Sequence, residues 1–185
     1  VNADPPPPPT PPPPPPFHPL EPSTPGGLLF SEAARAQVRD WGALGDHSHL
    51  CYSRRRDDAS STTFHANCDG QGASVTLIRL DNGLVFGGYT TSDWAGSGWH
   101  GSTYAFVFSL THNTRHRPVS STGRTTYANS NYGPTFGEGH TFSVSQGMTT
   151  GHCNPGHTSY GFSCGHGSYG SDVCREYLCG SYNSW

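Results

Sequence analysis

The sequence contains no lysine and few charged residues of any kind. Its ten basic residues are all arginine, charged residues make up 12% of the 185-residue chain, and the formal net charge is −3. The one basic run, Arg54–Arg56, is followed at once by Asp57 and Asp58. Because binding to a nucleic-acid backbone needs a basic stripe, nucleic acid is not predicted as a partner. Without lysine, a phosphate-binding Gly-Lys-Ser/Thr loop is excluded as well.

Long apolar runs are also absent. No stretch reaches the roughly 18 apolar residues that a membrane-spanning helix needs, so we expect no membrane span. No signal-peptide core is recognisable, and we interpret the chain as already processed for secretion. Hydrophobic residues make up 32% of the chain and aromatic residues 12%, beside 24 glycines. This composition is typical of a turn-rich all-β domain and not of a highly charged disordered chain.

Cysteines indicate the compartment. Four of the six lie within residues 153–179, a segment rich in Gly, Ser and Tyr with little apolar material to hold it together. Disulfides stabilise such a segment and need an oxidising compartment. Pairing of nearest neighbours, which closes short loops worth about 2–4 kcal/mol each, predicts Cys51–Cys68, Cys153–Cys164 and Cys174–Cys179. The alternatives are free buried thiols, or a zinc site that uses nearby histidines.

Proline is concentrated near the N-terminus, in two runs separated by Thr10. Proline fixes φ and has no N–H donor, so helix and sheet are excluded and polyproline II is expected. At ~3.1 Å per residue the run would form a semi-rigid rod of roughly 37 Å. We therefore divide the chain into a proline-rich stalk over residues 1–27 and a globular domain over residues 28–185.

Four interpretations of the stalk remain open. Extracellular proline runs broken by Thr or Ser resemble the hydroxyproline-rich glycoproteins of plant and green-algal walls. That resemblance implies hydroxylation and O-glycosylation at Pro5, Pro6, Pro7, Pro8, Pro9, Pro11, Pro12, Pro13, Pro14, Pro15 and Pro16, with Thr10 as a further acceptor of O-linked glycan. The alternatives are a ligand for aromatic grooves of the SH3 or WW kind, a rod that docks into a neighbouring molecule, and a plain linker.

Local patterns predict the elements of the globular part. Ser31 is expected to cap a helix that runs through Gly42, and a second short helix is expected over Ser60–Asn67. Asn82-Gly83 between two apolar runs predicts a β-hairpin. The expected strands are Leu50–Ser53, Ser74–Leu80, Leu84–Tyr89, Tyr104–Leu110 and His140–Ser145. The predicted fold class is mainly β, with two packed antiparallel sheets in a β-sandwich-like arrangement, a few short flanking helices and a preceding polyproline II segment.

Several strings follow one another along this part: Leu50–Arg54, Thr63–Gly70, Val75–Ile78, Val85–Thr90, Asp93–Trp94, Ala105–Leu110 and Tyr132–His140. In that order and spacing they resemble the TLDc domain family, from about residue 30 to the end. The resemblance implies two packed antiparallel sheets with flanking helices, and it does not imply an enzyme. Tyr177–Asn183 is similar to the family's last motif, after which members continue into one more strand, so we expect that strand to be missing. Intracellular members are linked with oxidation resistance and with the proton-pumping ATPase, roles that a secreted setting makes hard to transfer.

The candidate binding residues are aromatic. Tyr89, Trp94 and Trp99 lie in or beside Gly88–Gly101, which is expected to be a Gly/Ser-rich loop. Exposed Trp and Tyr side chains stack on sugar rings or anchor protein interfaces. The alternative is that they plug the core from a loop, an interpretation that suits Trp94 best, whereas Trp99 is the better candidate for exposure.

Metal-binding and catalytic constellations are weaker. Two groups contain residue types that bind zinc: His47 with His49, and His152, His157 and His166 near Cys153 and Cys164. Disulfide bonding would remove the thiolates, so we predict no metal and no cofactor. The candidate acids, Glu138 and the pair Asp57 and Asp58, are expected to be solvated loop carboxylates. We therefore predict no catalytic residues and no enzymatic activity.

These patterns favour a non-catalytic structural subunit of an extracellular glycoprotein assembly, such as a coat, a wall or a surface fibre. Repeated contacts of one subunit's rod with the next subunit's domain would polymerise it head-to-tail. The expected partners are other copies of the chain, other extracellular glycoproteins and glycans. The alternatives are a monomeric secreted module that binds carbohydrate or protein and, by family analogy, an oxidation-protective protein.

Overall fold

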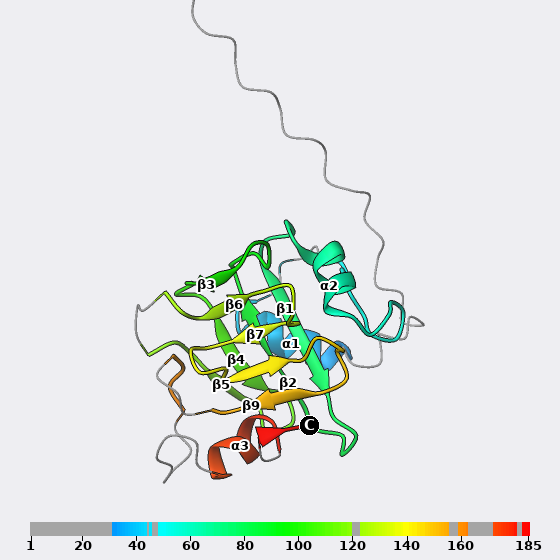
Figure 1. Ribbon diagram of the computed structural model, residues 1–185. Coiled ribbons are helices and arrows are strands. Elements are labelled where there is room, and N and C mark those ends of the chain that lie inside the picture. Colours follow the sequence, from blue (N-terminus) through cyan, green and yellow to red (C-terminus); the bar gives the residue numbers. More distant parts are fainter. Residues whose placement is uncertain are drawn as a thin grey trace, which may run out of the picture.

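The computed structural model describes residues 31–43, 45, 48–119, 123–155, 159–162, 172–180 and 183–185, which form two packed antiparallel sheets with short helices (Figure 1). The predicted fold class is confirmed, and the predicted stalk lies outside the described residues. In spatial order, one sheet contains β1 (Ser74–Arg79), β2 (Val85–Thr90), β4 (Phe106–Ser109) and β5 (Thr114–His116). The other contains β10 (Asn183–Ser184), β9 (Gly151–Cys153), β8 (Phe142–Val144), β7 (Thr135–Phe136), β6 (Thr126–Ala128) and β3 (Gly98–His100).

Three helices flank the sheets in the described part: α1 (Glu32–Asp40), α2 (Ser61–Cys68) and α3 (Asp172–Leu178). The two predicted helices are confirmed, and so is the predicted cap at Ser31. The Ser31 side chain accepts a hydrogen bond from the backbone N–H of Ala34, and the Ser60 side chain accepts one from Thr62. Such caps satisfy N–H groups that have no partner within the helix. Sequence patterns did not predict α3, and no helix among the described residues is long and apolar enough to cross a membrane.

The predicted hairpin joins β1 to β2, with Ser74 opposite Thr90 and Arg79 opposite Val85. The turn is wider than a two-residue connection. Gly83 alone adopts positive φ, at 89°, whereas the side chain of Asn82 accepts a hydrogen bond from the backbone N–H of Leu84 at 3.0 Å. The Asn-Gly signal therefore located the hairpin, although only its glycine uses the left-handed conformation.

Two apolar layers lie on the two faces of the four-stranded sheet. On its outer face, α1 contributes Val38 to a cluster with Phe106 and Phe108. On its inner face, Phe86 and Val107 meet side chains of the six-stranded sheet, such as Phe136. Figure 1 shows the consequence: α1 lies behind the four-stranded sheet, whereas the six-stranded sheet has its outer face toward the viewer.

Three predicted features of the strands are wrong. Leu50–Ser53 is not a strand, because its backbone hydrogen-bonding groups are used by side chains. Arg56 donates to the carbonyls of Leu50 and Cys51, and Asp57 accepts from the N–H of Ser53. Tyr104 does not join the buried face of its strand and is 68% exposed. The expected loop Gly88–Gly101 instead contains the end of β2 and the whole of β3.

One disulfide forms as predicted and one does not. Cys51 pairs with Cys68 at the end of α2, with a Cα–Cα distance of 5.3 Å. Cys153 in β9 pairs with Cys179, which follows α3, at a Cα–Cα distance of 6.5 Å. The predicted pairs Cys153–Cys164 and Cys174–Cys179 are therefore wrong, because the fold buries Cys153 and Cys179 together in one core cluster.

All five described cysteines are disulfide-bonded, Cys174 among them, whereas Cys164 lies outside the described residues. The alternative of free buried thiols is therefore wrong for these five cysteines. Within the described ranges, no group of three or more His, Cys, Asp or Glu side chains is placed to hold a metal ion.

Candidate functional site

The outer face of the six-stranded sheet carries a row of aromatic and polar side chains across five strands. Trp99 of β3 lies opposite Tyr127 of β6, and Ser143 of β8 lies opposite both Thr135 of β7 and His152 of β9. Side chains alternate between the two faces of a strand. Because Phe136, Phe142 and Cys153 fill the core, their neighbours in the chain face outward.

Four rings gather at one end of this row, and we call Trp99, Tyr127, Tyr132 and His140 the ring cluster. The centroid of Trp99 lies 4.9 Å from that of Tyr127 and 6.3 Å from that of His140. Tyr132 lies 6.3 Å from Tyr127 and 5.7 Å from His140. These separations are typical of paired aromatic side chains, and all four rings are half-buried, so each keeps part of its surface open to solvent.

The turn between β7 and β8 places His140 in the cluster. Gly137 and Gly139 have φ of 79° and 74°, and His140 itself has φ of 56°, a conformation that few non-glycine residues adopt. The backbone N–H of His140 donates to the carbonyl of Gly137 at 2.9 Å, which closes the turn. Burial, followed by the nearby His152, holds the pKa of His140 below its usual value. The ring is therefore uncharged at neutral pH.

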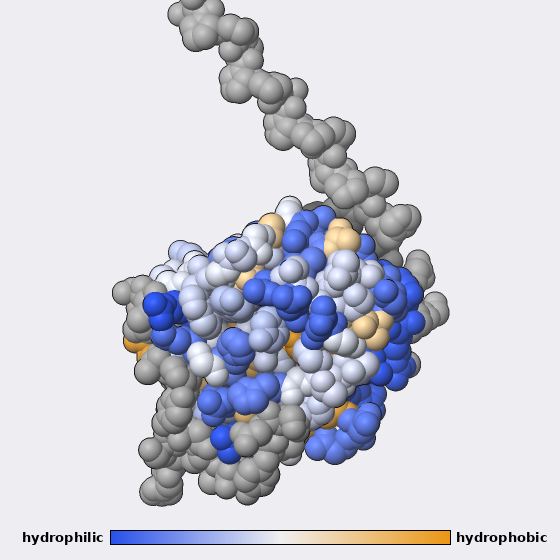
Figure 2. Space-filling view, viewed as in Figure 1, coloured by the Kyte–Doolittle hydropathy of each residue, from blue (hydrophilic) through white to orange (hydrophobic). Residues whose placement is uncertain are grey.

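An open hollow of about 410 Å³ lies beside the cluster, lined by Trp99, Gly139, His140 and His152. Figure 2 shows the same face as mainly blue and white, with orange in small separate patches. None of the hydrogen bonds between described residues uses the indole N–H of Trp99 or the hydroxyl of Tyr132. The face thus combines ring surfaces with unused hydrogen-bond donors.

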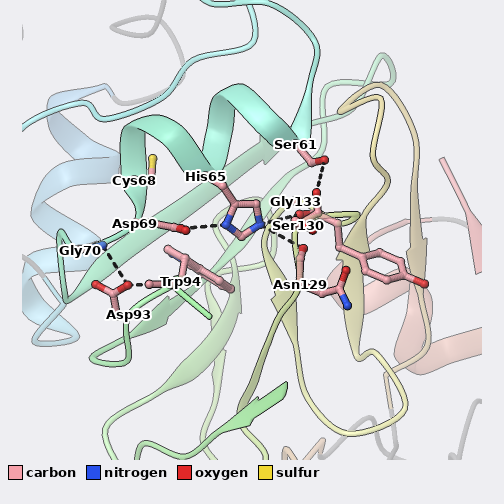
Figure 3. A network of polar contacts seen from close by, with 12 residues as sticks. Ser61, His65, Cys68, Asp69, Gly70, Asp93, Trp94, Asn129, Ser130 and Gly133 are labelled. Carbon is pink, nitrogen blue, oxygen red and sulfur yellow. Dashed lines mark hydrogen bonds and ion pairs between the residues drawn. The ribbon is translucent and has the colours of Figure 1, made fainter. Parts of the chain in front are cut away.

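Helix α2 fixes the loop that carries Tyr132 (Figure 3). The Nε2 atom of His65 lies 3.1 Å from the carbonyl oxygens of both Asn129 and Tyr132, while its Nδ1 atom lies 2.8 Å from Asp69. One turn earlier in the helix, the hydroxyl of Ser61 donates to the carbonyl of Ser130 at 2.7 Å. Two side chains on one face of α2 therefore hold three backbone carbonyls of the 129–132 loop at the edge of the ring cluster.

A second polar contact holds the segment that leads into β3. The carboxylate of Asp93 accepts hydrogen bonds from the backbone N–H groups of Gly70, Gly72 and Ala95. Burial opposes ionisation of this carboxyl, but the three N–H donors outweigh it and hold the pKa of Asp93 below its usual value. The next residue, Trp94, is thereby directed into the core.

The TLDc domain family model matches residues 40–172, well over half of the chain. The chain belongs to the TLDc domain family. No curated protein matches the chain. The ring cluster lies inside the matched range of the TLDc domain, whereas Cys179 lies after it, so the disulfide to Cys153 joins the sheet to the segment that follows the match.

The TLDc fold separates the three aromatic residues predicted to bind. Trp94 is 2% exposed, contacts Phe64 and Phe136, and donates its indole N–H to Ser74, so it is a core plug. Tyr89 packs against Phe106 in the layer below α1. Trp99 alone belongs to the ring cluster.

Sequence patterns missed the other members of the cluster. Tyr127 lies in a strand of three residues, too short to show an alternating pattern. Tyr132 and His140 lie outside strands, in loops that flank β7. The only local signal for them was the glycine-rich string around Glu138, which marks a tight turn without indicating which way its side chains face.

The predicted acids serve as structural partners in this TLDc domain. Asp57 pairs with Arg56, and the hydrogen bond from that guanidinium holds the pKa of the Asp57 carboxyl below its usual value. Glu138 pairs with Arg124 at the edge of the β7–β8 turn. The backbone carbonyl of Asp58 accepts a hydrogen bond from the hydroxyl of Tyr52. These contacts tie loops together.

The histidines considered as zinc ligands do not converge where they are described. His49 is exposed in the segment before Cys51, and His152 is exposed on β9, where it lines the hollow. Cys153, beside it, is in a disulfide. His47, His157 and His166 lie outside the described residues.

Proposed function

We propose that this chain is a non-catalytic structural subunit of an extracellular glycoprotein assembly, in which the TLDc domain makes contacts and the proline-rich segment serves as a rod. An oxidising compartment is supported by the disulfide bonding of all five described cysteines. The extracellular location, the assembly and the glycosylation of residues 5–16 belong to this proposal.

The ring cluster is the observation that carries the proposal. Aromatic side chains are enriched where proteins contact other macromolecules, and they bury a large area with little loss of side-chain entropy. Here four rings are held in place by strand pairing and by the contacts of α2 with the 129–132 loop. The hollow beside them is open, which suits an extended partner that lies along a surface.

Carbohydrate binding is a second candidate. It is favoured by the composition of the hollow, where an indole ring meets the imidazoles of His140 and His152. Indole surfaces stack on sugar rings, and imidazole nitrogens exchange hydrogen bonds with sugar hydroxyls. In this case the chain would act as a monomeric binding module.

Electron microscopy of the full chain, released by a secreting host and compared with the native secreted material, tests the proposal. We expect fibres or sheets with a regular repeat, because repeated subunit contacts build ordered arrays. Trp99→Ala should weaken assembly, whereas Tyr104→Ala, which removes an exposed ring outside the cluster, should leave it unchanged. Dispersed single particles at every protein concentration would contradict the structural role and favour the second candidate, a monomeric binding module.

The oxidation-protective alternative needs a reactive thiol. None of the five described cysteines offers one, since each is in a disulfide. The described residues therefore give this alternative no support. A titration that finds no free thiol in the secreted full chain would reject it.

A further inference from the structure

We infer that the ring cluster is the docking site for the proline-rich segment, residues 5–16, of a second copy of this chain. The inference rests on the proposed structural role and names the partner of its contact surface. The argument depends on the spacing of the rings, on hydrogen-bond chemistry and on where the proline-rich segment joins the domain.

The span of the ring cluster lies within the reach of one polyproline II repeat. Tyr127 lies 4.9 Å from Trp99 and 6.3 Å from Tyr132, measured between ring centroids, so the centroids of Trp99 and Tyr132 are at most about 11 Å apart. Prolines three residues apart repeat on one side of the helix every ~9 Å. Two prolines of one rod can therefore lie over the cluster at the same time.

The rings are inclined to one another, and the open hollow lined by Trp99 and His140 lies beside them. The plane of Trp99 makes 52° with Tyr127 and 54° with His140, and Tyr132 makes 72° with His140. Aromatic-lined grooves are the usual receptors for polyproline II segments, which insert pyrrolidine rings between the aromatic side chains. A sugar ring stacks best on a single flat ring, and this arrangement favours the proline rod over a glycan.

Hydrogen-bond chemistry points the same way. A proline run offers only carbonyl acceptors, since proline has no N–H. The ring cluster contains no carboxylate, and it offers the indole N–H of Trp99 and the hydroxyl of Tyr132, neither of which meets an acceptor among the residues described. The hydroxyl of Tyr127 accepts from Asn129 at 3.5 Å and keeps its own proton to donate. Donors on the domain therefore face a ligand made of acceptors.

The place where the proline-rich segment joins the domain favours a second copy as its source. The segment precedes Ser31, which caps α1 on the outer face of the four-stranded sheet. The ring cluster lies on the opposite side, on the outer face of the six-stranded sheet (Figure 1). The point of attachment and the ring cluster thus lie on opposite sides of the domain, which favours a rod supplied by a neighbouring copy.

Docking of this kind builds an open chain. The rod of one copy contacts the sheet of the next, and the two surfaces differ, so the contact is heterologous and does not close on itself. On the domain, His65 and Ser61 hold the Tyr132 loop before binding, and a polyproline II helix, the conformation expected of the rod, is extended without a partner. Little ordering is needed on binding, which makes a contact of small area effective.

Two measurements test the inference. The first is binding of a synthetic, unmodified peptide of residues 1–27 to the secreted full chain, measured by isothermal titration. The second is sedimentation velocity of the full chain over a range of concentrations, with and without excess peptide. We expect the peptide to bind, the full chain to associate as concentration rises, and excess peptide to reverse that association. A peptide of equal length with residues 5–16 replaced by Gly and Ser is the control ligand.

Trp99→Ala should raise the Kd of the peptide at least tenfold, and Tyr104→Ala should change it less than twofold. Tyr132→Phe keeps the ring and removes only the hydroxyl, so it is the variant to use if Trp99→Ala does not fold; a severalfold increase of the Kd is expected. Equal affinity of the wild-type chain for both peptides would overturn the inference. So would an unchanged Kd in both ring-cluster variants.

Other outcomes separate this inference from the proposed function. If the chain forms regular fibres but the peptide does not bind, the structural role stands and the docking site is wrong. If the peptide fails to bind and cellohexaose or an arabino-oligosaccharide binds in a Trp99-dependent way, the face is a glycan site and the inference is overturned. A third outcome is that the full chain stays monomeric and fails to bind the peptide at every chain concentration. In that case the ring cluster is occupied by the rod of the same chain, which also contradicts docking between copies.

Discussion

Trp94→Ala is predicted to remove a large share of the stability of the TLDc domain. The side chain is 2% exposed, and its ring centroid lies 5.5 Å from that of Phe136 and 5.8 Å from that of Phe64. Truncation of a buried tryptophan costs about 3–5 kcal/mol, and loss of the 2.8 Å hydrogen bond to Ser74 adds about 1 kcal/mol. Against a total of about 5–15 kcal/mol for a single domain, the variant would be marginally folded.

Trp99→Ala provides the matched comparison, since the same side chain is removed from a different environment. Trp99 is half-buried on the edge strand β3, and its closest ring contact is Tyr127. An aromatic pair of this kind contributes about 0.5–1.5 kcal/mol. The expected loss of unfolding free energy is therefore about 1 kcal/mol, several times smaller than for Trp94.

Urea unfolding followed by far-ultraviolet circular dichroism measures both losses, with the disulfides kept oxidised. This signal does not depend on the tryptophan that has been removed, and equal slopes would show that the two variants unfold to comparable states. A loss below about 1 kcal/mol for Trp94→Ala would refute the argument that this residue is a core plug. A larger loss for Trp99 than for Trp94 would refute the assignment of the two environments.

Three further predictions concern charge, pH and covalent bonds. Asp93→Asn should lower the unfolding free energy at pH 7 by about 1–3 kcal/mol, because a charged acceptor of three N–H groups is lost. Since the pKa of Asp93 is lowered on folding, the carboxylate stabilises the fold above its unfolded-state pKa, and this contribution disappears as pH falls through its folded-state pKa. The unfolding free energies of wild type and variant, measured with urea, should therefore converge toward pH 2. Burial is the main cause that lowers the pKa of both His116 and His140. On acidification the unfolded chain therefore takes up protons first, and the unfolding free energy should fall from pH 7 to pH 5. An unfolding free energy that stays constant over that range would contradict the burial of both rings. Non-reducing digestion and mass spectrometry should recover the peptides of Cys153 and Cys179 joined to each other, and Ellman's reagent should detect no thiol at either; a Cys174–Cys179 product would disprove the pairing.

Several elements were predictable because their signals are local. Ser31 and Ser60 cap helices through hydrogen bonds that span three residues or fewer. Gly83 supplies the positive φ of the hairpin turn, and the alternation of Phe106 and Phe108 with smaller residues marks a strand with a buried face. The two-sheet class followed from these elements, from the composition and from the resemblance to the TLDc family.

The candidate site was predictable only at Trp99. The remaining rings reach the cluster through cross-strand register, as for Tyr127, or through a turn with positive φ, as for His140. Neither the register nor the side on which a turn places its ring follows from spacing along the chain. Similarly, Trp94 and Trp99 are five residues apart in a segment of uniform composition, and only the packing of two sheets buries Trp94 fully and leaves Trp99 half-buried at the surface.

The cysteines show the same division. Their even number and their position in a segment poor in apolar residues indicated disulfides and an oxidising compartment, because those properties are counted along the chain. The partner of Cys153 was decided by tertiary packing, which brings Cys179, the residue after α3, to a Cα–Cα distance of 6.5 Å. Sequence by itself determines caps, turns and the apolar period, since these act within a few residues. Tertiary structure decides which surfaces and sulfur atoms meet, because it satisfies the packing of the whole core at once.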